Sequence, residues 1–319
     1  MSIKKLILAR PRGFCAGVDR AIDVVQIALE LFSGPVYVRK EIVHNRYVIE
    51  SLANRGAIFV EELDAVPDGA LVIFSAHGVS PEVRRRAAEK RLQVIDATCP
   101  LVTKVHLEAV RFAKEGLSII LVGHAGHEEV IGTMGEAPGS IQLVGTVEEA
   151  ERVQVADPER VAVITQTTLG VEDANVVIDV LRRRFPKLIT PSSGDICYAT
   201  QNRQTAVKMI GSDAQLVLVL GSPNSSNSRR LREVAETTGA RAYLIDDASE
   251  IKAEWLEGVT CAAITAGASA PEHLVQEVVD FFEELGATEV EEVEIVQEKV
   301  TFIPPTELAR EMEKRGAAR

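Results

Sequence analysis

The sequence lacks the positive charge that proteins use to bind nucleic acids or anionic membranes. Its 319 residues hold 47 acidic side chains against 35 Lys and Arg, for a formal net charge of −12. Such a surface repels a phosphate backbone and cannot release its counterions. We therefore expect no nucleic-acid partner and no membrane partner, and an anionic substrate would need a few local hydrogen-bond donors.

Long apolar runs and the common nucleotide motifs are also absent. No stretch approaches 18 uncharged apolar residues, so no membrane span is predicted. The first apolar run stops at Arg10-Pro11-Arg12 and is too short for a secretory signal, which favours a cytoplasmic location. There is no Walker loop, no Gly-x-Gly-x-x-Gly and no His-Glu-x-x-His, so neither a nucleotide site nor a zinc-protease site is indicated.

Cysteine is scarce, and the chain has only Cys15, Cys99, Cys197 and Cys261. Disulfides are not expected in a cytoplasmic protein, which leaves metal binding or simple burial. Cys261 lies inside an apolar, strand-like run, where burial is the simplest interpretation and no chemical role is expected.

What the chain does have is an alternation of short apolar runs and amphipathic helices. Continuous apolar runs between helices are typical of parallel strands that are buried on both faces. The runs that we expect to be strands are residues 5–9, 36–39, 71–74, 118–122, 161–165, 216–220 and 261–265.

The same order of events occurs three times. A cysteine precedes a helix (18–32, 101–114 and 200–210), a strand then ends in a polar loop, and a last strand ends in a second polar loop. The distances from cysteine to first loop are 29, 28 and 28 residues, measured to His44, His127 and Ser225. We predict an α/β fold of three similar βα modules with parallel sheets about a pseudo-three-fold axis. The modules are residues 1–96, 97–193 and 194–285, followed by an extension, 286–319, whose charged end from Thr306 should form a helix.

This repeat predicts a central cavity. Loops beyond the carboxyl ends of parallel strands form ligand sites, and three copies place Cys15, Cys99 and Cys197 around one point. A helix N-terminus lowers a thiol's pKa and favours the metal-binding thiolate. Three thiolates fit a 4Fe–4S cluster with one open iron, whereas a structural zinc wants a fourth ligand. The pattern favours the cluster without excluding zinc.

Polar residues in the predicted strand-end loops are candidates for substrate binding. They are His44, His77, His127, Ser225, Ser226, Asn227 and Ser269, and His124 lies in the same loop as His127. The serines could be helix caps only, but together with the histidines they suit a neutral cradle for a diphosphate, supported by helix N-termini. His106 and His273 lie on predicted helices, where a structural role is sufficient.

Glu129, next to His127 in a strand-end loop, is the best candidate proton donor. The simplest interpretation of any one acid among 47 is a surface residue. In a partly desolvated cavity, however, its pKa would rise and keep it protonated near neutrality.

Several ordered motifs resemble the LytB family, from about residue 3 to 304. They are Pro11-Arg12-Gly13-Phe14-Cys15-Ala16-Gly17-Val18, Glu41-Ile42-Val43-His44-Asn45, Ser75-Ala76-His77-Gly78-Val79, Asp96-Ala97-Thr98-Cys99-Pro100, Gly123-His124-Ala125-Gly126-His127, Thr165-Gln166-Thr167-Thr168-Leu169, Ile196-Cys197-Tyr198-Ala199-Thr200, Asn224-Ser225-Ser226-Asn227-Ser228 and Thr265-Ala266-Gly267-Ala268-Ser269-Ala270-Pro271. So many motifs in one order are specific.

The resemblance implies reductive dehydroxylation of 4-hydroxy-3-methylbut-2-enyl diphosphate to isopentenyl and dimethylallyl diphosphates, the last step of the methylerythritol phosphate route to isoprenoids. It implies one 4Fe–4S cluster on Cys15, Cys99 and Cys197, with the fourth iron open to the substrate's oxygen. Ferredoxin or flavodoxin would supply electrons.

The resemblance also assigns roles to the polar loops. Glu129 would protonate the leaving hydroxyl, with Thr167 in the same relay. The residues that would hold the diphosphate substrate are His44, His77, His127, Thr167, Ser225, Ser226, Asn227 and Ser269. From the residues alone, a zinc-dependent hydrolase and a non-catalytic cluster sensor stay open as alternatives.

Overall fold

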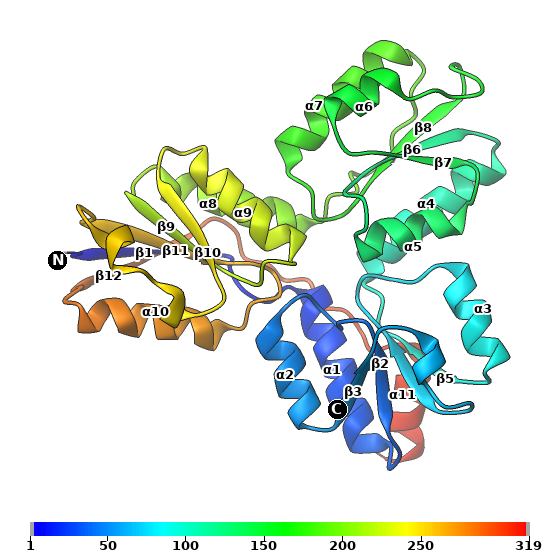
Figure 1. The fold of residues 1–319 in the computed structure, drawn as a ribbon, viewed down its shortest axis with the longest axis horizontal. Coiled ribbons are helices and arrows are strands. Elements are labelled where there is room, and N and C mark those ends of the chain that lie inside the picture. Colours follow the sequence, from blue (N-terminus) through cyan, green and yellow to red (C-terminus); the bar gives the residue numbers. More distant parts are fainter. Residues whose placement is uncertain (1–2, 317–319) are drawn as a thin grey trace. The chain divides into compact units, whose positions relative to one another are not determined.

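The computed structural model describes residues 3–316, which form three all-parallel sheets with helices (Figure 1). This confirms the predicted α/β class with three parallel sheets. The five-stranded sheet has the order β10 (Arg241–Ile245), β9 (Leu216–Leu220), β11 (Cys261–Ala266), β1 (Lys5–Arg10), β12 (Glu289–Glu294). The four-stranded sheet is β3 (Ala57–Val60), β2 (Val36–Arg39), β4 (Leu71–Phe74), β5 (Gln93–Asp96), and the three-stranded sheet is β7 (Ile141–Val144), β6 (Ser118–Val122), β8 (Val161–Thr165).

Helices connect these strands. The α-helices are α1 (Ala16–Leu31), α2 (Arg46–Asn54), α3 (Pro81–Glu89), α4 (Pro100–Lys114), α5 (Glu128–Glu136), α6 (Val147–Arg152), α7 (Val171–Arg184), α8 (Tyr198–Gly211), α9 (Ser226–Glu236), α10 (Glu272–Glu284) and α11 (Thr306–Lys314). Short 3-10 turns are η1 (Leu63–Ala65), η2 (Ala248–Glu250) and η3 (Ala253–Leu256).

Burial explains why the strands could be found in the sequence. All residues of β4, β8 and β9 are buried, because helices cover both faces of these sheets. In the three-stranded sheet, α4 and α5 pack on one face and α6 and α7 on the other. In the five-stranded sheet, α10 covers one face and α8 and α9 the other. The strands predicted at 36–39, 71–74, 118–122, 161–165 and 216–220 are confirmed with the same bounds.

The first strand differs from the prediction in its partners. β1 was expected in the first module, but it pairs with β11 and β12 in the sheet that holds the strands of the third module. A strand buried on both faces has the same apolar pattern whichever sheet it joins, so the sequence could not show this.

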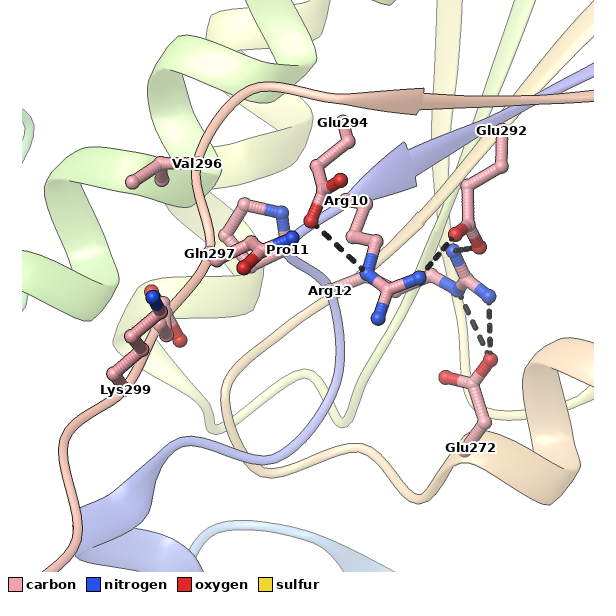
Figure 2. A pocket seen from close by; sticks show the side chains of 10 residues that line it. Arg10, Pro11, Arg12, Glu272, Glu292, Glu294, Val296, Gln297 and Lys299 are labelled. Carbon is pink, nitrogen blue, oxygen red and sulfur yellow. Dashed lines mark hydrogen bonds and ion pairs between the residues drawn. The ribbon is translucent and has the colours of Figure 1, made fainter.

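The acid-rich strand β12 was not predicted, because most of its residues are exposed. It pairs with β1 residue by residue, from Lys5 opposite Glu289 to Arg10 opposite Glu294. Arg10 binds Glu292 at 2.7 Å, and Arg12 binds Glu292 at 2.8 Å and Glu272 at 2.6 Å (Figure 2). Exposed ion pairs stabilise little, so backbone pairing to β1 chiefly holds this edge strand.

Contacts divide the described chain into two compact units. The first unit holds residues 3–18, His44–Val48 and Tyr198–Thr301, and the second holds Asp19–Val43, Ile49–Cys197 and 302–316. The helix expected from Thr306 is present as α11 and buries Leu308, while the last part of that expectation, 317–319, lies outside the described residues. Among residues 3–316, no helix has the length and apolar character needed to cross a membrane.

Candidate functional site

Cys15, Cys99 and Cys197 occupy one structural position in three copies. Each is the residue directly before a helix: α1 begins at Ala16, α4 at Pro100 and α8 at Tyr198. The predicted position at a helix N-terminus is therefore confirmed for all three. Backbone N–H groups at such an end are oriented toward an anion that precedes the helix.

The backbone of these cysteines is anchored in the same way three times. The N–H of Cys99 donates to the carbonyl of Ala76 at 3.0 Å, that of Cys197 to Thr167 at 3.0 Å, and that of Cys15 to Ala268 at 3.3 Å. Each acceptor lies two residues beyond the end of a strand, β4, β8 or β11. Each cysteine is thus held against the second polar loop that the repeat predicted.

The surroundings of Cys15 modify the expected effect of the helix end. Desolvation is the largest influence and raises the pKa of the Cys15 thiol above its ordinary value. The positive charge of Arg203 and the N–H groups of Val18 and Gly17 lower that pKa, as expected at a helix N-terminus. The donors at a helix N-terminus are predictable from the sequence, whereas the desolvation that outweighs them depends on the folded structure.

Glu129 and Thr167 form one buried hydrogen-bonded pair in the second unit. Both the backbone N–H and the side-chain hydroxyl of Thr167 donate to Oε2 of Glu129, at 3.0 and 2.8 Å. Only 5% of Glu129 and 4% of Thr167 are exposed, which contradicts the simple reading of Glu129 as a surface acid. Because the carbonyl of Thr167 accepts from Cys197, the same residue contacts the candidate acid and a candidate metal ligand.

Two histidines lie next to this pair. His127 caps α5, where its Nδ1 accepts the N–H of Glu129 at 3.2 Å. The rings of His127 and His77 meet edge to face with centroids 5.9 Å apart. Ser75 lies 3.3 Å from Nδ1 of His77. The second unit therefore brings together His77, His127, Glu129 and Thr167.

His124, from the same loop, is placed by its backbone, whose N–H donates to Gln166 at 3.0 Å.

In the first unit, polar side chains gather at the start of α9. Ser225 caps this helix and accepts the N–H of Ser228, and Ser225, Ser226 and Asn227 are all buried. The side-chain oxygen and nitrogen of Asn227 are buried without a hydrogen-bond partner. An unsatisfied buried amide is costly, so this one is suited to a ligand.

Gly221 and Gly267 allow the close packing behind that helix start. A Cβ on either would lie about 2 Å from the Ser228 hydroxyl, at 2.1 and 2.0 Å. Only glycine fits both positions, and this brings the loops after β9 and β11 together. In the loop after β11, Ser269 donates to the carbonyl of His44 at 2.8 Å.

His44 therefore lies in the first compact unit, together with the loops of the predicted third module. His77 lies in the second unit.

The residues given no chemical role have ordinary structural surroundings. His106 is buried on α4 and bonded to Glu136 at 2.9 Å, and His273 is exposed on α10. Cys261 starts β11.

Within residues 3–316, no group of three or more His, Cys, Asp or Glu side chains is arranged to hold a single metal ion. The ligands of a four-iron cluster bind separate irons, so this finding concerns mononuclear sites.

Comparison with known proteins identifies the family. A family model described as LytB protein matches residues 6–283. The chain belongs to the LytB family. Among curated relatives, a 4-hydroxy-3-methylbut-2-enyl diphosphate reductase of Acidothermus cellulolyticus is 59% identical over 98% of this chain and 92% of its own. One of the same name from Bordetella pertussis is 56% identical over 97% of this chain and 95% of its own.

Solved structures of the family have the same fold. The E-1-hydroxy-2-methyl-but-2-enyl-4-diphosphate reductase of Plasmodium falciparum matches with a TM-score of 0.93 at 38% identity, covering 99% of this chain and 100% of that one. A second structure, of (E)-4-hydroxy-3-methyl-but-2-enyl diphosphate reductase, matches with a TM-score of 0.63 at 33% identity over 88% of this chain and 99% of its own.

Proposed function

We propose that this LytB-family chain reduces 4-hydroxy-3-methylbut-2-enyl diphosphate to isopentenyl and dimethylallyl diphosphates, the last step of the methylerythritol phosphate route. Two electrons and two protons replace the allylic hydroxyl by hydrogen and release water. Curated relatives with that reductase name cover nearly the whole chain. The observation that carries the proposal is the threefold position of Cys15, Cys99 and Cys197, each directly before a helix and anchored to a strand-end loop.

These three cysteines would hold one 4Fe–4S cluster with an open fourth iron. The donor set fits, because three thiols, each directly before a helix, supply three ligands. When bound, the cluster would supply electrons and a Lewis-acidic iron. The pseudo-three-fold axis and the central cavity are part of this proposal, as are the modules 1–96, 97–193 and 194–285 and the extension 286–319.

Glu129 would hold the proton that leaves with the hydroxyl. Its carboxyl group is fixed by two hydrogen bonds from Thr167, and the N–H of Glu129 is fixed by His127. Such rigid placement is what general acid catalysis requires. Thr167 would belong to the same relay, since its hydroxyl contacts the carboxylate directly.

Neutral donors would bind the diphosphate. The candidates are His44, His77, His127, Thr167, Ser225, Ser226, Asn227 and Ser269. The unpartnered amide of Asn227 and the N-terminus of α9 support this, because both offer donors without adding charge. With a net charge of −12, the chain depends on such local donors for an anionic substrate.

The electron donor is expected to be a small one-electron carrier such as ferredoxin or flavodoxin, and the location is expected to be cytoplasmic.

Anaerobic purification with metal and sulfide analysis, followed by turnover with dithionite and a viologen, tests the proposal. We expect iron, acid-labile sulfide and consumption of the diphosphate substrate. A colourless protein that contains zinc and no iron would favour a zinc hydrolase and contradict the proposal. Cluster-loaded protein that never consumes the substrate would favour a sensor.

A further inference from the structure

Each helix that follows a proposed cluster cysteine carries a cationic side chain at nearly the same distance. Arg20 on α1 lies five residues after Cys15, Lys104 on α4 five after Cys99, and Arg203 on α8 six after Cys197. None of the three has a role in the reaction described above. Their contacts, however, repeat one another.

Arg20 holds the segment before Cys99. Its Nη1 donates to the carbonyls of Ala97 at 3.1 Å and Thr98 at 3.0 Å, and Thr98 is the residue directly before Cys99. Its Nε donates to the carbonyl of Ile303 at 2.8 Å. One guanidinium thus fixes two consecutive peptide groups next to the cysteine.

Lys104 holds the segment before Cys197. Its Nζ donates to the carbonyls of Ser193 at 2.8 Å and Gly194 at 3.0 Å, and to Oδ1 of Asp195 at 3.1 Å. The other carboxylate oxygen of Asp195 accepts the N–H of Thr165, at the end of β8, at 2.9 Å. The segment is therefore held from both sides.

Arg203 holds the segment before Cys15. Its Nη2 donates to the carbonyls of Gly13 at 2.7 Å and Phe14 at 3.2 Å, and Phe14 directly precedes Cys15. Arg203 is fully buried, and its charge is balanced by Glu298 at 3.1 Å. A charge is buried at such cost only where several bonds compensate it.

The order of these contacts is cyclic along the chain. The helix after Cys15 holds the segment before Cys99, the helix after Cys99 holds the segment before Cys197, and the helix after Cys197 holds the segment before Cys15. We infer that Arg20, Lys104 and Arg203 are positioning residues that fix the three cysteine segments for cluster binding. This inference rests on the proposed function.

Two observations favour positioning over general stabilisation. Each cation, besides its other partners, binds two backbone carbonyls within four residues of a cysteine. In addition, two of the cations interact electrostatically with the cysteine whose segment they hold: Arg20 with Cys99 and Arg203 with Cys15. Residues that orient metal ligands commonly change metal affinity when they are substituted.

Lys104 gives the sharpest test because its side chain is 29% exposed, whereas Arg203 is fully buried. We would load Lys104→Met with the cluster anaerobically and follow iron release to a chelator by visible absorption, together with the EPR spectrum of the reduced cluster. We expect release about ten-fold faster than in the wild type and a changed EPR signal. Lys104→Arg should restore both, since a guanidinium can donate to the same carbonyls. Lys114→Met, at an exposed site on the same helix, is the control.

The possible outcomes are distinct. If wild-type protein takes up no cluster, the proposed function fails, and this inference fails with it. If wild type is loaded but Lys104→Met releases iron at the rate of the Lys114→Met control with an unchanged EPR signal, the inference alone is overturned. Arg20→Gln repeats the measurement on the Cys99 segment, so that poor folding of one variant leaves the inference testable.

Discussion

The starts of α5 and α9 have the same backbone arrangement but differ in the hydrogen bonding of their buried polar side chains. Both helices follow a strand-end loop 28 residues after a cysteine, and both are capped by a side chain, His127 in α5 and Ser225 in α9. At α5, the acid Glu129 is fixed inside the protein by Thr167. At α9, the buried amide of Asn227 has no partner within the protein. The repeat therefore supplies the position, and we propose that the side chain decides whether a proton is moved or an anion is bound there.

Replacing Glu129 should have the largest effect on turnover. Glu129→Gln keeps the size of the side chain and removes its proton, so we expect turnover to fall about 10²- to 10⁴-fold. The cluster absorption should be unchanged, because no ligand is altered. Steady-state kinetics and the visible spectrum of the same sample check this. Equal loss of cluster and turnover would refute the assignment.

Substitution of Thr167 should lower turnover less than substitution of Glu129, because it acts only through the hydrogen bond to the Glu129 carboxyl group. Thr167→Val removes the hydroxyl that donates to Glu129 but keeps the backbone N–H that donates to the same oxygen. A hydrogen bond to the neutral, proton-carrying form of Glu129 is worth about 1 kcal/mol, or roughly five-fold in turnover. Thr167→Ser is the matched control and should retain most activity. Wild-type kinetics for Thr167→Val would remove Thr167 from the relay.

A second acid of the same unit offers a test of stability against pH. Desolvation, with the hydrogen bond and charge of Asp195, raises the pKa of Glu108 to about 7, against the opposing charges of Lys104 and Arg111. The folded state therefore holds this proton more tightly than the unfolded state. Its stabilising contribution is complete below pH 4.5 and is lost as pH rises to about 7.

In the wild type we expect the free energy of unfolding to fall by about 2 kcal/mol over this pH range, and Glu108→Gln should abolish this fall. Urea unfolding at a series of pH values between these limits measures it. If the free energy of unfolding depends on pH in the same way in both proteins, the pKa of Glu108 is not raised by folding.

Substitution of Asn227 tests the proposed anion-binding role of the α9 start. Asn227→Ala should raise KM about ten-fold by removing about 1.4 kcal/mol of ligand binding, with little change in kcat. Folding stability should not fall, because the lost amide atoms have no partner in the protein. Ser225→Ala serves as a contrast, since it removes a helix cap and should cost about 1 kcal/mol of stability. A large loss of stability in Asn227→Ala would mean that the amide is structural.

Substitution of Cys261 should have the smallest effect on iron content and activity. It starts β11 in the five-stranded sheet and lies outside the repeated position before a helix. Cys261→Ala should keep the full iron content and activity. Loss of iron in this variant, measured by metal analysis, would show that the cluster ligands are misassigned.

The sequence predicted the parts of this molecule that depend on local patterns. The core strands were found because their residues are apolar and buried on both faces. The three cysteines were found because spacing and helix onset repeat in the chain. The partners of β1 and the presence of β12 could not be predicted, since they depend on pairing between segments more than 250 residues apart, such as Lys5 with Cys261 and with Glu289.

The roles of the candidate site residues stay predictions, and the resemblance had already placed Thr167 in one relay with Glu129. That Thr167 also binds the backbone of Cys197 could not be predicted, because it follows from loops that meet in space. Arg20, Lys104 and Arg203 were missed, although a signal existed, because a cation recurs five or six residues after each cysteine. Charged residues on helices are usually solvated, and only the structure shows that these three bind backbone carbonyls.

A Mössbauer spectrum of anaerobic protein loaded with ⁵⁷Fe most directly tests whether the three cysteines share one cluster. The account predicts the signature of a single 4Fe–4S cluster in which one iron differs from the other three and changes when the diphosphate substrate is added. The same pattern should be absent from a Cys99→Ser variant. A spectrum of four equivalent irons that ignores the substrate, or a protein with no cluster iron, would contradict it.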